Sequence, residues 1–529
     1  MVRLFERLDD IAGIDVPDFA ALWLERIAFV FLLLMALSAP HSIAVSQSSW
    51  LLGSLATALR LVIKPRPAFR FSALHIALIA LLIWAFVSSV FSYEPALSLD
   101  KMRGVGLLFV FFFSYLNLRK LSAIKLVVFL LLFSCMFNVA WSLADRAIGR
   151  GIQVYGVSPD GPLGKAGIVD SQVILTASGK KIHSADELRQ VILENWITRV
   201  RVYWPEEYIN FDIQRSDLVS SAATSEEALG IAAWNTGRNW RAQGFFSHFT
   251  TYAEMLQLIA SLLFGLIVAS IVRGRQTQPG NDVLKHLTST PVMIVCLAAT
   301  LIVMVLTVTR ASQGAFMLSA FVIVLLSGSR KLLLAAIIVA IPLALGAILF
   351  LQQSRGIGVV DSKDESTQYR LTMWRDGWRL SHANVHNLVF GIGMDSTKKH
   401  WQEWGMFDGG FLPMGHFHST LMQMLVERGI PGLLIWLAVI LLYGLILWRA
   451  VWRQRNEQAS DRWTFGILLG CLGGLIGFFT SGVVHYNIGD GEVAMVFYLL
   501  MAIAVRMTEL LGSQPSEAQA LAAQVGVAA

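Results

Sequence analysis

Two histidines separated by one residue carry the strongest chemical signal in this sequence. His416 and His418 follow a loop rich in glycine and aromatic residues, and they precede a short apolar run that breaks at Gly429 and Pro431. Because a membrane-spanning stretch comes next, the pattern predicts two imidazoles at a membrane surface. Imidazole is the side chain that exchanges protons most readily near neutral pH. The pair is therefore a candidate for proton transfer, and hydrogen bonding to loop carbonyls is the structural alternative.

Three arginines are candidates for binding an anionic substrate. Arg310 lies between two closely spaced apolar runs, Arg370 opens a stretch rich in Arg and Trp that includes Trp374, and Arg241 precedes another apolar run. A guanidinium binds phosphate oxygens with two parallel hydrogen bonds and does not lose its proton. An arginine at membrane depth needs a counter-charge or water. For Arg310, snorkelling to the interface is the alternative explanation.

Two other kinds of site are weighed against this chemistry. The His pair with Asp408 or Glu403 could hold a metal ion, but no third ligand stands at a typical helical spacing, so we predict no metal and no cofactor. Gly391-x-Gly393 lacks a third glycine and a preceding parallel strand, which excludes a dinucleotide site and predicts a turn.

The composition shows what must position these residues. The chain has 529 residues, of which 55% are hydrophobic and 15% charged, and its mean hydropathy is +0.60. One soluble core cannot bury this much apolar surface, so we expect a polytopic membrane protein with about twelve spans. The clearest spans are Phe71–Ser92, Ala123–Ala144, Pro291–Thr309, Leu332–Leu351, Gly429–Trp448 and Trp463–Val484, and the weakest are Trp50–Ile63 and Gly104–Leu118. The three cysteines, Cys135, Cys296 and Cys471, lie in apolar runs, where no disulfide is expected.

The charge pattern predicts the topology. The formal net charge is +6, and its Lys and Arg collect in short loops, at residues 64–70, 119–125 and 449–462. Short basic loops stay in the cytoplasm, so both termini are expected inside, and nucleic acid is not an expected partner. The first ten residues are too acidic for a signal peptide, so the first span is expected to remain. Two polar segments, residues 145–248 and 353–418, then fall outside.

Residues 147–216 look like a small α+β insert. Alternating apolar runs predict strands near residues 151–156, 173–178, 199–204 and 208–215, with a helix from Ser184 to Ile192. The order resembles a bacterial periplasmic PDZ domain, although Val169-Asp170-Ser171 stands where Gly-Asp is usual. PDZ domains add a peptide strand to a sheet edge. The resemblance implies a possible peptide partner, and a structural spacer is the alternative.

An ordered set of motifs resembles the O-antigen ligase and O-antigen polymerase superfamily. The motifs are Arg241-x-x-Gly244-x-Phe246, Thr309-Arg310-Ala-Ser-Gln-Gly314, Arg370-x-x-x-Trp374, Gly391-Ile-Gly393 and His416-Phe-His418-Ser-Thr-Leu-x-x-x-Leu-x-Glu427-x-Gly429-Ile-x-Gly432. Two departures stand out. The usual Thr-x-Ser-Arg-Gly is Thr307-Val-Thr309-Arg310-Ala311 here, and Ser419 replaces the Asn of His-x-His-Asn.

The resemblance implies a fold and a domain plan. The fold is an all-α polytopic membrane protein of about twelve transmembrane helices, similar to GT-C glycosyltransferases, with the small α+β insert. Residues 1–146 form N-terminal transmembrane helices, and residues 217–512 form the ligase-like transmembrane domain with a periplasmic catalytic loop at 353–428. Residues 513–529 form a disordered cytoplasmic tail.

The resemblance also implies a reaction. Members of this superfamily are inverting glycosyltransferases that use an undecaprenyl-diphosphate-linked glycan as donor and a hydroxyl acceptor, without a required metal. Carried over by motif, Arg310, Arg370 and Arg241 bind the diphosphate and His418 is the base, with His416 as alternate. Glu427 and Trp374 support them.

Several acceptors fit this donor. Lipid A core is the leading one, which would make the protein an O-antigen ligase, and a growing glycan or a protein are the alternatives. A transporter of lipid-linked sugar is an alternative of another class, disfavoured because no internal repeat is evident. The expected location is the bacterial inner membrane, in contact with membrane lipid, with the active site facing the periplasm.

Overall fold

The chain folds into two compact units, one helical and one built around a sheet. The computed structural model describes residues 2–67, 69–204, 207–219, 222–238, 240–274, 288–338, 365–410, 415–457 and 461–513. The helical unit comprises residues 1–136, 250–304 and 309–529, and the sheet unit comprises residues 137–249 and 305–308. Eight helices within the described ranges are long and apolar enough to cross a membrane. The predicted class, a polytopic helical membrane protein with a small α+β insert, is confirmed.

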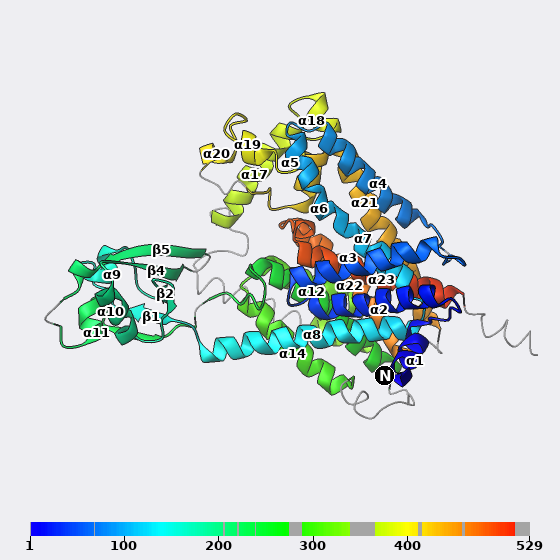
Figure 1. Ribbon diagram of the computed structural model, residues 1–529, viewed down its shortest axis with the longest axis horizontal. Coiled ribbons are helices and arrows are strands. Elements are labelled where there is room, and N and C mark those ends of the chain that lie inside the picture. The colour runs from blue at the N-terminus through cyan, green and yellow to red at the C-terminus, as the bar shows by residue number, and fades with distance from the viewer. Residues whose placement is uncertain are drawn as a thin grey trace, which may run out of the picture. The chain divides into compact units, whose positions relative to one another are not determined.

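The helices within the described ranges are, in order, α1 (Val2–Ala12), α2 (Phe19–Ser38), α3 (Ile43–Val62), α4 (Ala73–Val90), α5 (Pro95–Asp100), α6 (Met102–Val105), η1 (Gly106–Leu108), α7 (Phe109–Asn117), α8 (Leu121–Ile148), α9 (Pro162–Lys165), α10 (Ala185–Glu194), η2 (Arg215–Asp217), α11 (Ser225–Leu229), α12 (Phe249–Arg273), α14 (Thr290–Leu306), α15 (Arg310–Ser327), α17 (Glu365–Ser381), α18 (Val385–Val389), α19 (Thr397–His400), α20 (Phe407–Gly410), α21 (Thr420–Asn456), α22 (Arg462–Gly482), η3 (Asn487–Gly489) and α23 (Gly491–Gly512). Figure 1 shows the long helices α2, α3, α12, α22 and α23 gathered in one bundle.

Most predicted spans correspond to one of these helices. The prediction for Trp50–Ile63 was too short, because that stretch is the second part of α3. The stretch Gly104–Leu118 is not one helix, since α6, η1 and α7 divide it. The predicted span Leu332–Leu351 lies outside the described residues from position 339 onward. The number of about twelve spans therefore stays a prediction.

Polar residues begin several of the long helices. Asp18, Ser419 and Asp461 each accept a hydrogen bond from the backbone N–H three residues later, as helix N-caps do. α12 and α22 then approach closely because glycines line the contact: a Cβ at Gly265 would lie 2.4 Å from the backbone nitrogen of Gly470. Small residues allow such close contact between helices in membranes.

Three long helices of the helical unit end on the same side of the bundle. Arg273, at the end of α12, donates hydrogen bonds to the carbonyls of Gln454 and Glu457, where α21 ends. Gly328, which follows the last residue of α15, lies against the guanidinium of Arg455. The opposite ends of α12, α15 and α21, where these helices begin, therefore share the other side of the bundle.

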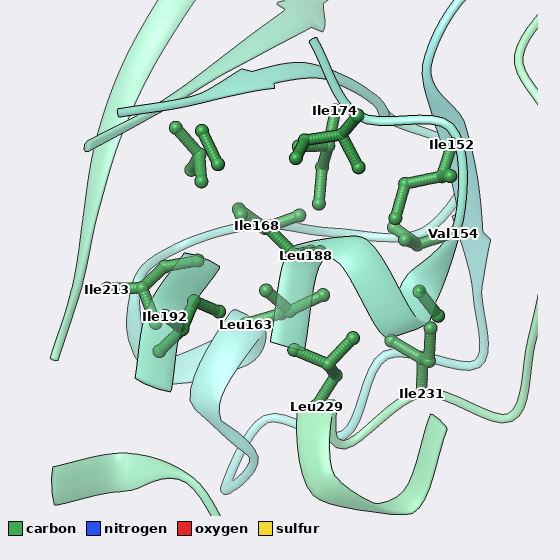
Figure 2. Close-up of a cluster of buried hydrophobic side chains, with 14 of the residues drawn as sticks. Ile152, Val154, Leu163, Ile168, Ile174, Leu188, Ile192, Ile213, Leu229 and Ile231 are labelled. Carbon is green, nitrogen blue, oxygen red and sulfur yellow. The ribbon is translucent and has the colours of Figure 1, made fainter. Parts of the chain in front are cut away.

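The sheet unit is antiparallel with the strand order β5-β4-β2-β1-β6, and β3 pairs with β2. Its strands are β1 (Ile152–Tyr155), β2 (Val173–Ala177), β3 (Lys180–Lys181), β4 (Ile197–Trp204), β5 (Glu207–Gln214) and β6 (Ala233–Thr236). Aliphatic side chains from the strands and from α9, α10 and α11 fill one core, as Figure 2 shows for Ile152, Ile174, Leu188 and Ile213. The predicted strands and helix of the insert are confirmed, and the PDZ assignment stays a prediction.

The sheet extends beyond residue 216, the predicted end of the insert. β6 pairs along its length with β1, from Ile152 opposite Thr236 to Tyr155 opposite Ala233. Arg150 donates its N–H to the carbonyl of Gly237, and Gly237 donates to the carbonyl of Gly151. The two ends of this module therefore lie side by side.

Candidate functional site

The two predicted histidines form a tight turn directly before α21. The backbone N–H of His418 donates to Nδ1 of His416 over 3.1 Å, and the two ring centroids are 4.1 Å apart. His418 has φ +46°, a left-handed conformation that costs a non-glycine residue about 1 kcal/mol or more. Both imidazoles are half-buried. The chain thus bends sharply, and the two imidazoles lie close together with their planes inclined by 59° just before a long helix.

Three hydrogen bonds hold this turn. Trp374 in α17 donates its indole N–H to the carbonyl of Phe417 over 3.0 Å, and the N–H of Phe417 donates to Oε1 of Gln423 over 2.9 Å. The hydroxyl of Ser419 accepts from the N–H of Met422 and caps α21. Ser419 thus fills the position that Asn occupies in the related motif, and it acts there as a helix cap. Trp374 supports the histidine turn by contact with its backbone.

Arg370 lies beside the connection between α22 and α23. Its Nε donates to the carbonyl of Val484 over 3.3 Å, and the side chain is half-buried. Two residues later in the connection, the ring of Tyr486 lies 5.9 Å from that of His416. The same connection accepts a hydrogen bond from Thr420, because the N–H of Thr420 lies 2.9 Å from the carbonyl of His485. The structure therefore gathers Arg370 and both histidines around residues 484–487.

Arg310 is the first residue of α15, and its side chain is exposed. The common orientation of α15 and α21 puts this residue at the same end of the bundle as His418. A helix N-terminus also carries a partial positive charge, which adds to the charge of the guanidinium. Arg310, Arg370 and His418 thus share one side of the helical unit.

Arg241 belongs to the sheet unit. Its guanidinium donates to the carbonyls of Thr307 and Val308 and lies 3.9 Å from the ring centroid of Phe249. Its backbone N–H donates to the hydroxyl of Tyr203 over 2.9 Å. These four partners belong to the sheet unit as well.

Glu427 is buried where α21 is interrupted. Gly429 has φ +67° inside the helix, and Pro431 follows. The carboxylate oxygen Oε1 of Glu427 accepts the N–H of Asp395 over 3.0 Å, while Oε2 makes no hydrogen bond to the described atoms and lies 3.6 Å from the guanidinium of Arg428. A buried carboxylate that is only partly paired is costly to keep.

Gly391 and Gly393 form the turn that the sequence predicted. The backbone of this turn packs against the backbone of Glu427. The N–H of Ile392 donates to the carbonyl of Val426, and the N–H of Gly393 donates to the carbonyl of Glu427. Both glycines have positive φ. A Cβ at Gly391 would lie 2.3 Å from the carbonyl carbon of Glu427, so this close approach requires glycine.

Several polar residues near this site were not predicted. Arg428 is buried, and its guanidinium lies 3.1 Å from each sulfur of Met394 and Met424. His485 contacts the carboxylate of Glu254 at 2.8 Å. In the sequence, nothing local distinguishes Glu254 from a surface glutamate. His485 directly follows the last residue of a predicted span, and this position at a span end was the one sequence signal that could have identified it.

Burial shifts the pKa values of two groups in the connection between α22 and α23. Removal from water, reinforced by the negative charge of Glu254, raises the pKa of Asp490 to about 7. Burial, reinforced by the charge of Glu427, raises the pKa of the Tyr486 phenol to about 12. Asp490 therefore titrates near neutral pH, and Tyr486 stays protonated and can donate a hydrogen bond.

Glu403 and Asp408, the two carboxylates that were considered as metal ligands, have other partners. Glu403 contacts Nδ1 of His400 at 2.8 Å, and Glu94 contacts Nε2 of the same ring at 3.1 Å. These carboxylates raise the pKa of His400. Asp408 lies 3.6 Å from Arg375. Within the described ranges, no group of three or more His, Cys, Asp or Glu side chains could hold a metal ion.

The fold and the site define a class: a polytopic helical membrane protein with imidazole and guanidinium groups gathered at one end of its bundle. Residues 294–437 match the family model for O-antigen ligase, and this match supports membership of the O-antigen ligase superfamily. The matched segment contains Arg310, Arg370, both histidines and Glu427, and it excludes Arg241. The family indicates a ligase or polymerase type of activity on lipid-linked glycan. No curated protein matches the chain significantly.

Proposed function

We propose that this protein transfers a glycan from undecaprenyl diphosphate to a hydroxyl acceptor on the periplasmic side of the bacterial inner membrane, with lipid A core as the acceptor. The observation that carries the proposal is the grouping of Arg370, His416 and His418 around residues 484–487, at the bundle end where Arg310 begins α15. The family match covers Arg310, Arg370 and both histidines.

In the proposed step, the oxygen of the acceptor hydroxyl attacks the anomeric carbon of the first sugar from the face opposite the diphosphate. The bond between that carbon and the phosphate oxygen breaks, and its electron pair leaves with undecaprenyl diphosphate. The configuration at the carbon is inverted. The hydroxyl proton passes to an imidazole, so the reaction is balanced without a redox partner.

His418 is the better base of the two. Nδ1 of His416 accepts the backbone N–H of His418, which places the proton of a neutral His416 ring on Nε2. A ring in that tautomer has no lone pair left to accept the proton of a substrate. The hydrogen bond therefore favours an orienting role for His416 and leaves the base role to His418.

Arg370 and Arg310 are proposed to bind the diphosphate, because guanidinium groups match phosphate oxygens and stay charged. In the structure Arg370 uses Nε on the carbonyl of Val484, a contact that fixes the direction of the side chain. Arg241 is a weaker candidate since its guanidinium already donates to two backbone carbonyls.

The decisive experiment incubates the purified full chain with a defined undecaprenyl-diphosphate glycan and three candidate acceptors: lipid A core, the same glycan on its lipid, and a Ser/Thr-containing protein. Mass spectrometry of the products identifies the acceptor. Product on lipid A core supports the ligase, product on glycan makes the protein a polymerase, and product on protein makes it an O-oligosaccharyltransferase. Movement of the donor across a vesicle membrane without any product would make it a transporter and refute the proposal.

A further inference from the structure

Two polar side chains in the first turns of α12 have no part in the chemistry proposed above. The hydroxyl of Thr251 donates to Oδ2 of Asp490 over 2.8 Å, and Oε1 of Glu254 lies 2.8 Å from Nδ1 of His485. Glu254 is 2% exposed and His485 is 8% exposed. α12 thus reaches the connection between α22 and α23 through two buried polar contacts one helical turn apart.

The connection that these contacts hold is the one that supports the candidate site. Within residues 483–490, the carbonyl of Val484 accepts from Arg370, and the carbonyl of His485 accepts from both the N–H and the hydroxyl of Thr420. Thr420 is the first residue of α21 and follows His418 by two positions. A shift of the 483–490 segment would therefore move the partner of Arg370 and the start of the helix behind His418.

The contacts with α12 are not required to hold the 483–490 segment against the end of α22. Asn487 already fastens it, since its amide donates to the carbonyl of Phe478 and to the hydroxyl of Ser481, and its oxygen accepts from Thr420. The pair between Glu254 and His485 adds a specific position relative to α12. Keeping this carboxylate is costly, because its Oε2 is buried and makes no hydrogen bond to the described atoms.

We propose that Glu254 and His485, together with Thr251 and Asp490, are positioning residues that hold the 483–490 segment so that Arg370 and His418 keep their reactive geometry. The carboxylate of Glu254 accepts the Nδ1–H of His485 and so fixes both the tautomer and the direction of the ring, as carboxylates do for histidines in other sites. The catalytic consequence rests on the proposed function, whereas the positioning of the segment does not.

The test uses the purified full chain in lipid nanodiscs and four variants: Glu254→Ala, Glu254→Gln, His485→Ala and the double variant of Glu254→Ala with His485→Ala. Ser270→Ala is the matched control, because Ser270 is a buried polar residue of the same helix whose hydroxyl, among the described residues, bonds only the helix's own Leu266 carbonyl. Hydrogen–deuterium exchange of residues 483–490 and the glycan transfer rate are measured together.

We expect Glu254→Ala to speed exchange of the segment about 10-fold and to slow transfer about 10- to 100-fold, the usual range for residues that orient a reactive group. Glu254→Gln, whose amide oxygen still accepts from His485, should recover most of both. The double variant should be no worse than either single variant, because both remove one contact.

Unchanged exchange in Glu254→Ala would overturn the proposal, and so would transfer within twofold of Ser270→Ala when the parent protein is active. Faster exchange throughout the helical unit would also overturn it, since that result indicates general destabilisation. A parent protein that transfers no glycan, combined with faster exchange confined to the 483–490 segment in Glu254→Ala, would refute the proposed function and leave the positioning of the segment supported.

Discussion

Gly391→Ala tests whether the turn at Gly391 sets the position of Glu427. In the structure Gly391 has φ +74°, and a Cβ at this position would lie 2.3 Å from the carbonyl carbon and 2.4 Å from the carbonyl oxygen of Glu427. Both atoms belong to backbone that cannot rotate away as a side chain can. The substitution must therefore move the 391–393 turn away from α21.

Three terms give the magnitude. Left-handed backbone at a non-glycine residue costs about 1–2 kcal/mol. Overpacking of a well-packed interior costs about 1–3 kcal/mol more. Alanine restricts the unfolded chain more than glycine does, and this effect offsets about 0.4–1 kcal/mol of the two costs. Gly405→Ala is the matched control, because Gly405 has φ +55° and nothing within 4 Å of an added Cβ. Gly405→Ala has the cost of left-handed backbone and the offset from the unfolded chain, and only Gly391→Ala also has the overpacking cost.

The assay is thermal unfolding of the two purified variants under identical conditions, with transfer activity measured beside it. We expect Gly391→Ala to be less stable than Gly405→Ala by about 1–3 kcal/mol, the overpacking term alone. We also expect it to lose activity, since the turn donates to the carbonyl of Glu427. Equal stability of the two variants would refute the close approach on which this reasoning depends.

Four further predictions follow from the site and the fold. His418→Ala should insert normally in the membrane and lower transfer by about 10²- to 10⁴-fold, the contribution of a positioned base; near-normal product from an inserted variant would exclude that role. Arg310→Lys should raise the donor KM several-fold, because a point charge does not replace a guanidinium fork, and an unchanged KM would count against diphosphate binding. Replacing residues 151–236 by a short linker should leave a folded membrane protein, because Arg150 and Gly237 are hydrogen-bonded neighbours; removing 150–216 alone should give a degraded product, because β6 then lacks β1. Asp490 has a pKa of about 7 in the folded protein, above its ordinary value of 3.8, so the folded state binds more protons between these values and stability falls as pH rises through this window. Asp490→Asn should flatten that dependence of Tm on pH, and a parent whose Tm rises over the same range would contradict the sign.

The strands and the long helices were predictable because their signals are local. Alternating apolar residues indicated β4 and β5, and long apolar runs indicated the membrane-spanning parts of α21 and α22. The interruption at Gly429 and the turn at Gly391 were likewise visible from glycine and proline alone. The extent of the sheet unit was less visible, since β6 is a strand of four mostly exposed residues whose partner precedes it by about 80 positions.

The partners within the site were not predictable from local signals. Arg370 reaches a carbonyl 114 residues away, and Glu254 reaches a histidine 231 residues away. Hydrophobic periodicity shows that a helix lies in a membrane, but it does not show which helix packs beside it. Lipid tails are as apolar as the side chains, so hydrophobicity alone does not select a partner helix.

The sequence by itself therefore determined that this is a membrane protein with a folded α+β insert, and that two imidazoles precede a broken helix. It also identified three arginines as candidates for binding a phosphate group. Only the tertiary structure decided that the connection between α22 and α23 brings Arg370 to the histidine turn, and that α12 holds this connection. The physical reason is that hydrogen bonds between distant segments depend on how helices pack, whereas spacing and composition report only on each segment alone.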